Sequence, residues 1–210
     1  GVRPFSGSNR AAFFSSLYGH PIPALGTPLR RALDDAGQYY SRTDNRGPWG
    51  NTPGTDDGVA SNTHVQCRQS YTILMTDGYW NSAQASTAAA RANVDGTGGP
   101  SHTGPGNASF TYAAVSPFSD GHSNTLADVA MYYWKNDLRT DLDNAVPVST
   151  INPAFWQHMS TFGVGLGVTG SVSPTAAFNA IATGAVITWP DPNPTAANAA
   201  KLDDLLHASV

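Results

Sequence analysis

Three apolar runs along the chain predict β-strands. They cover residues 70–76 (SYTILMT), 161–168 (TFGVGLGV) and 185–189 (AVITW). Each run is short, is rich in β-branched or aromatic residues, and has a Gly or Pro within the next two residues, as strands usually do. We interpret the first two as strands that are buried on both faces, as in a parallel sheet.

Around these runs, apolar residues recur at the three- and four-residue spacing of amphipathic helices. Helices that alternate with apolar strands predict an α/β fold, with a mostly parallel sheet flanked by helices. With 210 residues, the chain suits one domain rather than two. The predicted helices cover residues 8–18, 28–40, 124–135, 152–156, 174–182 and 195–208, and Asn124 or Thr125 caps the third.

The helix over residues 28–40 has a clear start. Thr27 is the expected N-cap, and Pro28 stands at the first helical position, where proline is tolerated. Its spacing also predicts which face is buried. The core face is expected to hold Leu29, Ala32, Leu33, Ala36 and Tyr40, and the solvent face Arg30, Arg31, Asp34 and Asp35.

Two long segments show no regular period. Residues 41–69 are rich in turn formers, and residues 81–123 contain mostly Ala, Ser, Gly and Thr with few large apolar residues. Loops longer than about 15 residues are usually functional or lack a fixed structure. Both segments border the first predicted strand, so we expect them to be insertions that cap a binding edge and contact a partner.

Composition narrows the class of protein. Only 12% of the residues are charged and the formal net charge is −4, which argues against a nucleic-acid-binding surface. The 21 Gly and 15 Pro fit the long irregular loops of an extracellular protein. No run approaches the roughly 20 apolar residues that span a bilayer. Because the chain starts at Gly1 without an initiator Met or a signal peptide, we expect it to be part of a longer protein.

Cys67 is the only cysteine, so no disulfide forms within the chain. It either pairs with a cysteine outside this segment or remains a free, partly buried thiol. A catalytic thiolate is disfavoured, because no His or Asn near it in the sequence suggests an activated nucleophile.

The end of the first predicted strand carries the strongest candidate site. Asp77 follows the strand directly and Gly78 permits a sharp turn, at the end of a parallel strand where α/β folds bind ligands. The hydroxyl of Thr27 can reach the same edge. Thr27 and Asp77 are therefore candidate metal ligands, and Gly78, Tyr79 and Trp80 are candidate ligand-binding neighbours. The structural alternative is that Thr27 only caps a helix and Asp77 only ends a strand.

A nucleotide site competes with this interpretation. Gly165, Gly167 and Gly170 match the dinucleotide-binding fingerprint, and Asp191 lies about 20 residues further on. However, Pro174 sets the start of the next helix too late for the third glycine to belong to it. The phosphate would lose its binding position, so close backbone packing is the favoured role of these glycines.

Catalysis is also disfavoured. The six histidines are scattered and none has the i, i+4 spacing of a helical zinc pair. The acidic segment 137–144 lacks the glycine and the closing glutamate of a calcium-binding helical loop. No nucleophile, base and orienting group converge, so we expect no catalytic residues and consider a secreted hydrolase the weakest hypothesis.

Several segments resemble a known adhesion module. GTPLRRAL at 26–33 and TDG at 76–78 resemble the second and third parts of the metal-ion-dependent adhesion site (MIDAS) of von Willebrand factor A-like domains. Longer segments, which cover nearly the whole chain, are similar to the N-terminal region of the PilY family of type IV pilus tip-associated adhesins. They are TDNRGPWGN (43–51), SYTILMTDGYWN (70–81), TLADVAMYYWKNDLR (125–139), DNAVP (143–147), NPAFWQHMSTFGVGLGVTG (152–170) and KLDDLLHASV (201–210).

The resemblance implies a Rossmann-like von Willebrand factor A-like domain over residues 1–210 that is incomplete at its N-terminal side. The family's first metal-binding motif, DxSxS, is absent and would lie upstream of Gly1. In the strand order 3-2-1-4-5-6, the three predicted strands would be the fourth, fifth and sixth. The implied cation is Mg²⁺ or Mn²⁺, with Ca²⁺ as an alternative, and its binding is expected to be weak or absent without the upstream motif.

The resemblance also implies a function. It predicts a non-enzymatic adhesion and assembly module at the type IV pilus tip, exported through the periplasm to the cell surface, with a part in pilus retraction, twitching motility and surface sensing. The implied partners are minor pilins, a host or abiotic surface ligand, and a C-terminal β-propeller of the same full-length protein. The alternative is a structural domain that docks onto minor pilins and has a vestigial metal site.

Overall fold

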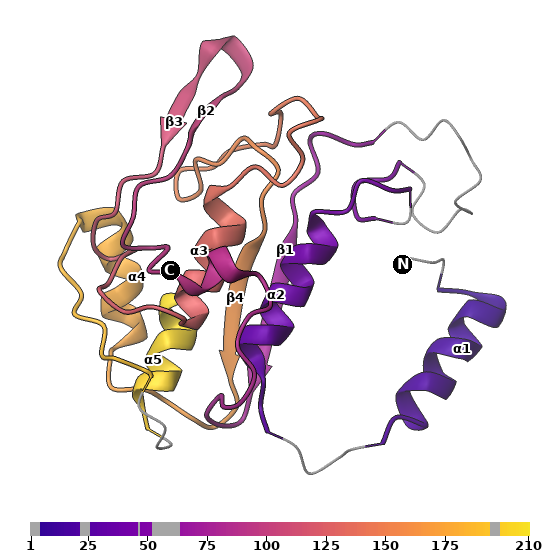
Figure 1. Ribbon diagram of the computed structural model, residues 1–210, viewed down its shortest axis with the longest axis horizontal. Coiled ribbons are helices and arrows are strands. Elements are labelled where there is room, and N and C mark those ends of the chain that lie inside the picture. Colours follow the sequence, from indigo (N-terminus) through magenta and orange to yellow (C-terminus); the bar gives the residue numbers. More distant parts are fainter. Residues whose placement is uncertain (1–4, 22–25, 46, 52–63, 194–197) are drawn as a thin grey trace.

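In the computed structural model, helices pack against a small parallel sheet (Figure 1). A hairpin projects from this body, and one helix stands apart from it. The α/β class predicted from the sequence is confirmed. The structure describes residues 5–21, 26–45, 47–51, 64–193 and 198–210.

The central sheet consists of β1 (Tyr71–Thr76) and β4 (Ser160–Gly165), which run parallel and pair from their first residues to their last. The chain passes through α3 between them, as a parallel pair requires a long crossover. The strand predictions for residues 70–76 and 161–168 are confirmed, although the second strand ends earlier than expected.

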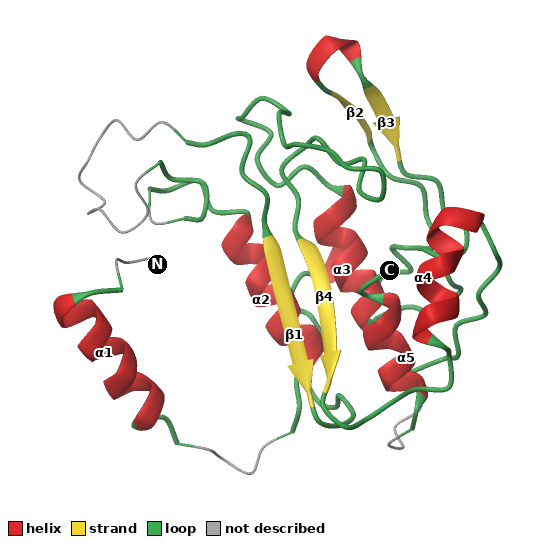
Figure 2. Ribbon diagram, turned by 180° about the vertical axis from the view of Figure 1, so that it is seen from behind, coloured by secondary structure: helices red, strands yellow, loops and turns green. Residues whose placement is uncertain are grey.

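The two faces of this sheet differ in their surroundings. Leu74 and Thr76 point to the helices and are buried. On the opposite face, which Figure 2 shows from the front, Ile73 is 65% exposed, Met75 57% and Phe162 49%. The expectation that both strands are buried on both faces is therefore wrong for the part of the chain that the structure describes, because no described element covers this face.

Helices α2 (Leu29–Tyr40) and α3 (Leu126–Lys135) cover the other face (Figure 2). Leu33 is fully buried in the core that they form with β1. The two helices approach most closely at Gly37, where a Cβ atom would overlap the ring of Tyr133. Both helix predictions are confirmed.

The details of α2 differ from the prediction. Arg30 and Asp34 are buried and Ala32 is exposed, because the segment after β1 packs over the side that we assigned to solvent. Thr27 is not the N-cap. Pro28 occupies that position, its carbonyl accepts a hydrogen bond from the Ala32 N–H, and no side chain caps the helix.

The start of α3 is a capping box. The Thr125 hydroxyl accepts a hydrogen bond from the Asp128 N–H at 2.9 Å, and the Asp128 carboxylate accepts one from the Thr125 N–H at 3.0 Å. Of the two predicted caps, Thr125 is therefore the correct one.

Two further helices follow β4. In α4 (Pro174–Thr183), Pro174 is the first helical residue, as the sequence predicts, and Ser173 is the N-cap. Helix α5 (Ala200–His207) begins later than the expected 195, and residues 195–197 lie outside the described residues.

The segment 81–123 contains more regular structure than expected. It includes a 3-10 helix, Ala88–Arg91, and a hairpin of β2 (Ser101–Thr103) and β3 (Ser109–Thr111) that is closed by the 3-10 turn Pro105–Asn107. This hairpin projects away from the central sheet in Figure 1.

In the other predicted insertion, 41–69, residue 46 and residues 52–63 lie outside the described part. Trp49 is fully buried there, and its indole N–H donates to the Tyr40 carbonyl at 2.6 Å.

The predicted third strand, 185–189, is irregular and pairs with none of the described strands. The Ile187 N–H donates to the Ser116 hydroxyl at 2.8 Å, and the Trp189 indole donates to the Pro117 carbonyl at 2.8 Å. The prediction is wrong because these groups bond a loop of the insertion instead of a strand.

The predicted short helix 152–156 is irregular. Asn152 Oδ1 accepts from the Ala154 N–H at 3.1 Å, and the Trp156 indole donates to the Trp134 carbonyl at 2.7 Å. The fully buried Trp156 anchors this segment, so tertiary packing overrides the helical pattern.

Helix α1 (Gly7–Tyr18) confirms the prediction for 8–18, but none of its residues is buried. Its aromatic residues contact one another instead of a core. The ring centroid of Phe13, for example, lies 5.3 Å from that of Phe5 and 5.5 Å from that of Phe14.

Candidate functional site

The C-terminal end of β1 presents the predicted strand-end site. The Gly78 N–H donates to the Thr76 hydroxyl at 3.2 Å, which closes the turn around Asp77. Asp77 itself is exposed. A carboxylate is thus held at the end of a parallel strand, facing solvent.

Thr27 lies against the segment that continues from this turn. Its N–H donates to Asn81 Oδ1 at 2.8 Å, and the Asn81 N–H donates back to the Thr27 carbonyl at 2.9 Å. The preceding Gly26 is required here, because a Cβ atom would overlap the Asn81 and Ser82 side chains. The roles of Thr27 and Asp77 as metal ligands remain predictions.

The aromatic neighbours of Asp77 have different environments. Tyr79 is 38% exposed, whereas Trp80 is 4% exposed. The Arg30 guanidinium stacks over the Trp80 ring at 4.0 Å, and the Lys201 ammonium lies 4.9 Å from its centroid. Trp80 is therefore buried among packing contacts, and the ligand-binding roles of Gly78, Tyr79 and Trp80 stay predictions.

Arg30 links α2 to two loops. Its guanidinium donates to the Asn124 carbonyl at 2.7 Å and to the Ser82 carbonyl at 3.2 Å. Burial lowers the pKa of Arg30, although the carboxylate of Asp204 opposes this shift. These contacts fix the segment that follows the candidate site.

Asp204 of α5 joins three parts of the structure. Its carboxylate accepts hydrogen bonds from the N–H groups of Leu126 and Ala127, at the start of α3, and from the Trp80 indole, all at 2.9 to 3.0 Å. Burial raises the pKa of Asp204 to about 6, even though these backbone donors favour the charged form. The negative charge at the N-terminus of α3 complements the helix dipole.

Asp34 anchors the segment 81–123 to α2. Its carboxylate accepts hydrogen bonds from the Ser86 and Thr87 N–H groups at 2.7 and 3.1 Å, and from the Tyr133 hydroxyl at 2.7 Å. Although burial opposes ionisation, these donors lower the pKa of Asp34 to about 2. Asp34 is thus a structural carboxylate.

The glycine-rich turn after β4 is filled by a side chain. Asp203 accepts from the Ser171 hydroxyl at 2.7 Å and from the Val172 N–H at 2.8 Å. A Cβ atom at Gly170 would overlap the same carboxylate. An acid group therefore occupies the turn where the nucleotide alternative requires a phosphate, which supports the packing role of these glycines.

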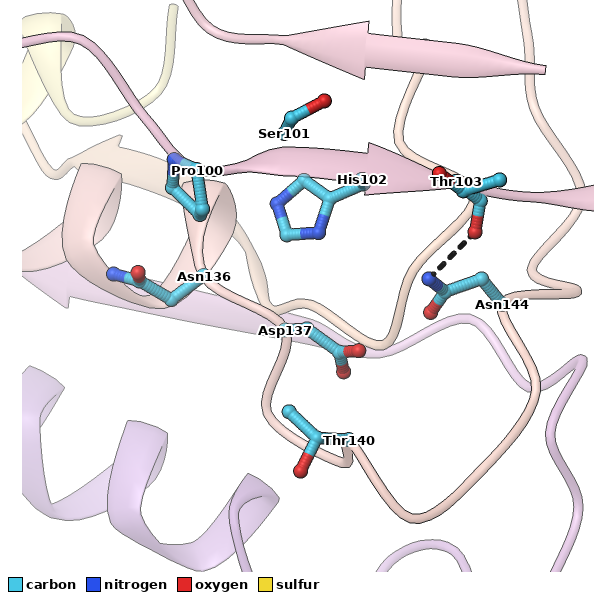
Figure 3. A pocket seen from close by; sticks show the side chains of 8 residues that line it. All are labelled: Pro100, Ser101, His102, Thr103, Asn136, Asp137, Thr140 and Asn144. Atoms are coloured by element: carbon cyan, nitrogen blue, oxygen red, sulfur yellow. Dashed lines mark hydrogen bonds between the residues drawn. The ribbon is translucent and has the colours of Figure 1, made fainter. Parts of the chain in front are cut away.

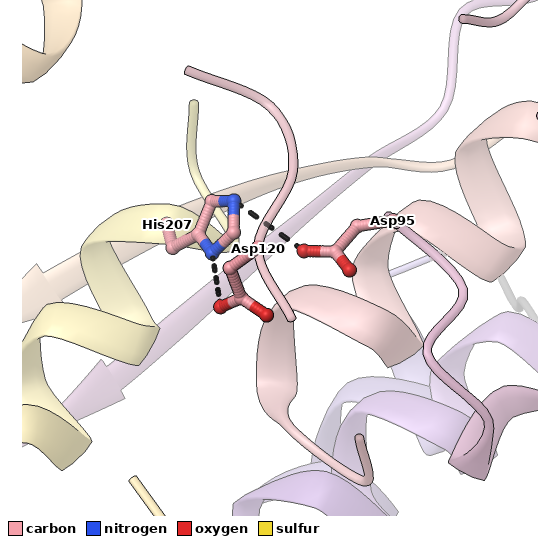
Figure 4. Close-up of side chains that lie close together, drawn as sticks. All are labelled: Asp95, Asp120 and His207. Atoms are coloured by element: carbon pink, nitrogen blue, oxygen red, sulfur yellow. Dashed lines mark ion pairs between the residues drawn. The ribbon is translucent and has the colours of Figure 1, made fainter. Parts of the chain in front are cut away.

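A second group of functional side chains lies between the insertion and α5. Asp95, Asp120 and His207 each offer a ligand atom within 4.8 Å of the others, and their side chains are at most 8% exposed. Figure 4 shows the imidazole between the two carboxylates. His207 Nε2 lies 3.5 Å from Asp95 Oδ2, and Nδ1 lies 3.4 Å from Asp120 Oδ2.

The pKa values of the two carboxyl groups in this group are shifted in opposite directions. Burial, together with the carboxylates of Asp120 and Asp128, raises the pKa of Asp95 to about 8. Burial also acts on Asp120, but the His207 imidazole and the His122 N–H hold the pKa of Asp120 below its usual range. This group could not be predicted from the sequence, because its members are far apart in the chain and share no metal-binding motif.

An open polar hollow of about 480 Å³ lies at the base of the hairpin (Figure 3). His102 forms its floor, stacked on Trp156 with ring centroids 4.1 Å apart. Asn144 donates to the Thr103 carbonyl at 3.0 Å across one side. Burial raises the pKa of Asp137, which lines the opposite wall. These polar groups are mostly bonded to each other or to the backbone.

Cys67 is a free thiol within the chain and is exposed rather than partly buried.

Within the described ranges, no helix has the length and apolar character needed to cross a bilayer.

Comparison with known proteins identifies relatives along the whole chain. It is 36% identical, over 233 aligned positions, to the type IV pilus biogenesis factor PilY1 of Pseudomonas aeruginosa strain PAK, and 34% identical to PilY1 of strain PAO1. A third PilY1, from strain UCBPP-PA14, is 34% identical over 82% of the chain. No family model and no solved structure matches the chain.

The first two alignments include 100% of the chain but only 19% of each relative, so the chain corresponds to a fraction of a much larger protein. The resemblance to the PilY family found in the sequence is thus confirmed. The chain belongs to the PilY1 family of type IV pilus biogenesis factors.

Proposed function

We propose that this chain is a von Willebrand factor A-like module that acts in type IV pilus biogenesis as a non-enzymatic adhesion and assembly part of the pilus tip. The observation that carries this proposal is the reciprocal pair of hydrogen bonds between Thr27 and Asn81, which holds Thr27 beside the segment that presents Asp77. A hydroxyl, an exposed carboxylate and the end of a parallel strand are suitable parts of a divalent-cation site.

In this proposal, Thr27 offers a neutral oxygen and Asp77 binds the cation directly or through a water molecule. A hard cation such as Mg²⁺ or Mn²⁺ that has few anionic ligands stays electrophilic, so it can accept a carboxylate from a partner. Tyr79, which is partly exposed beside Asp77, would contact that partner. The ligands that complete the coordination sphere would come from a DxSxS motif upstream of this chain.

The proposed setting is the cell surface, where the module would face minor pilins and a host or abiotic surface ligand. A β-propeller of the same full-length protein is a further proposed neighbour. The names of the relatives support a role in pilus biogenesis and do not point to an enzyme.

Calorimetric titration with Mg²⁺ and Mn²⁺ tests the cation site. We expect binding in a form extended upstream to include DxSxS, loss of binding in its Asp77→Ala variant, and retention in an Asp143→Ala control, which changes an exposed carboxylate elsewhere. Binding that survives Asp77→Ala, or no binding in the extended form, would contradict the adhesion mechanism.

A second candidate function is a structural domain that docks onto minor pilins and has a vestigial metal site. The uncovered sheet face favours it, because Ile73, Met75 and Phe162 form an exposed apolar surface that another protein segment would bury. Docking that is independent of Mg²⁺ and sensitive to changes on this face would distinguish it from the first candidate.

A further inference from the structure

We propose that Asp95 and His207, with Asp120 orienting the imidazole, form a separate metal site that is suited to a first-row transition-metal ion, with Zn²⁺ as the expected occupant. These residues lie between the insertion and α5, whereas the strand-end site lies at Asp77 (Figure 4). The inference goes beyond the proposed adhesion function and does not depend on it.

The first argument is that two ligand atoms that face each other both lack hydrogen-bond partners. Asp95 is 1% exposed, yet among the described residues neither of its carboxylate oxygens has a hydrogen-bond partner of ordinary geometry, and His207 Nε2 has none either. The backbone N–H groups of Gly96 and Asp120 lie near enough only to favour the charged form of Asp95. Asp95 Oδ2 and His207 Nε2 face each other at 3.5 Å. Two ligands that are each about 2.0 to 2.1 Å from a tetrahedral Zn²⁺ are separated by roughly 3.4 Å. The gap therefore has the width of a shared metal ion, and it is long for a direct hydrogen bond.

The second argument is the orientation of the imidazole. Because Asp120 faces Nδ1 at 3.4 Å, a neutral ring carries its proton on Nδ1 and directs the lone pair of Nε2 toward Asp95. A carboxylate that orients a metal-binding histidine in this way is common around zinc. Trp189 stacks on the ring with centroids 4.2 Å apart and keeps it in this plane. Asp120 acts here as a positioning residue for His207.

The third argument is charge. Asp95, Asp120 and Asp128 bring three carboxylates into one buried region, and the cations that face Asp95 are His207 and Lys135. The Lys135 ammonium is already bonded to the carbonyls of Val94 and Thr97. A divalent cation beside Asp95 would favour the ionised form of its carboxyl group and offset the repulsion among the three carboxylates.

The backbone around the group is fixed. The Tyr112 hydroxyl donates to the carbonyl of Asp95 at 2.7 Å and lies 3.3 Å from that of Phe118, which ties the two loops together. The His122 N–H donates to Asp120 Oδ1 at 2.7 Å. Preorganised ligands of this kind are typical of a functional site.

The ligand set determines the class of ion. Imidazole nitrogen suits Zn²⁺ and its first-row neighbours, whereas Mg²⁺ and Ca²⁺ prefer ligand sets made only of oxygen. We therefore expect this site to discriminate against the cations proposed for Thr27 and Asp77.

The test is a ZnCl₂ titration of chelator-treated, purified protein by calorimetry, in a Cys67→Ser background that removes the exposed thiol. We expect one Zn²⁺ whose affinity falls at least roughly 100-fold in Asp95→Asn or His207→Gln, and about 10- to 100-fold in Asp120→Asn. The matched control is Asp191→Asn, which alters an exposed Asp beside His122 and should bind Zn²⁺ as the parent does. Asp77→Ala should also bind Zn²⁺ normally, so this proposal and the strand-end proposal fail independently.

Thermal unfolding gives a second readout. The Asp95→Asn variant should lose the stabilisation that Zn²⁺ gives to the parent, because the substitution removes the anionic ligand. If His207→Gln does not fold, Co²⁺ absorption of the unsubstituted protein replaces it, and a tetrahedral spectrum is expected. No Zn²⁺ uptake by the parent, or unchanged affinity in Asp95→Asn, would overturn the proposal and leave a buried ion-pair cluster.

Discussion

The indole N–H of Trp80 donates a 2.9 Å hydrogen bond to the carboxylate of Asp204, although the two residues are 124 positions apart. This bond fastens the segment after the candidate strand-end site to α5. The same carboxylate accepts the first backbone N–H groups of α3. The buried carboxylate of Asp204 thus connects the segment after β1, the start of α3 and α5.

The bond between these residues can be tested by Trp80→Phe. We expect a loss of about 1.5 to 3 kcal/mol in the free energy of unfolding, because a hydrogen bond to a buried charge is lost. Chemical denaturation measures it. Tyr79→Phe, a change at the exposed neighbour, should stay within about 0.5 kcal/mol of the parent. Equal effects of the two changes would contradict this role of Trp80.

Asp34→Asn should destabilise the protein by about 2 to 4 kcal/mol at neutral pH, because the five groups that donate to this buried carboxylate lose their charged acceptor. The exposed Asp35→Asn is the control and should change stability by less than about 1 kcal/mol.

The effect of Asp34 should also depend on pH. Its pKa is about 2 in the folded state, against about 3.9 when unfolded. A depressed pKa contributes stability above the unfolded value, and this contribution is lost as the pH falls from about 4 to 2. Denaturation curves at pH 7 and pH 3 should therefore show a smaller difference between parent and variant at the lower pH; a constant difference would argue against the pKa shift.

Gly37→Ala should cost about 1 to 3 kcal/mol, because the new methyl group overlaps the Tyr133 ring where α2 and α3 meet. At Gly98 a Cβ atom would make only an ordinary contact, so Gly98→Ala is the matched control and should be nearly neutral. Thermal unfolding compares the two. A neutral Gly37→Ala would mean that the helices can move apart without loss of packing.

Gly26→Ala tests the geometry of the strand-end site. The methyl group should displace the Asn81 side chain and break its bond to the Thr27 N–H, with little change in overall stability. In the upstream-extended form we expect Mg²⁺ affinity to fall about tenfold. Gly121→Ala, in open space, should not change it. An unchanged Mg²⁺ affinity in Gly26→Ala would argue against Thr27 as a metal ligand.

Ile73→Lys tests the uncovered sheet face. Ile73 is mostly exposed, so stability should change by less than about 0.5 kcal/mol. If this face docks onto a pilus protein, surface piliation of a strain that carries the substitution should fall. Ile151→Lys, at an exposed position outside the sheet, is the control and should leave piliation unchanged. Full piliation with Ile73→Lys would argue against the docking role.

Much of the fold could be predicted from local sequence. The cap at Thr125, the helix start at Pro174 and the strand before Asp77 follow from residue types at short spacing. The burial of Arg30 and Asp34 could not be predicted, because their partners lie on segments far along the chain. The spacing of apolar residues predicts one buried face of a helix, but it does not show which other segments pack against the remaining faces.

The same reason limits the prediction of sites. Thr27 and Asp77 were found because both stand at the ends of regular elements. Asp95, Asp120 and His207 come from two loops and the end of α5, and only folding brings them together. The segment 185–189 shows the reverse error, since its apolar composition suits a strand but its N–H groups bond to a loop.

The cap that Asp204 provides for α3 also dictates an order of events during synthesis. The acid lies 78 positions after the Leu126 N–H that it accepts, so α3 emerges from the ribosome long before its start can be satisfied. Contacts of such sequence separation form late, because a long loop must close first. The Thr125 capping box needs only neighbouring residues and can form at once, whereas the N–H groups of Leu126 and Ala127 gain their acceptor only when α5 has been made.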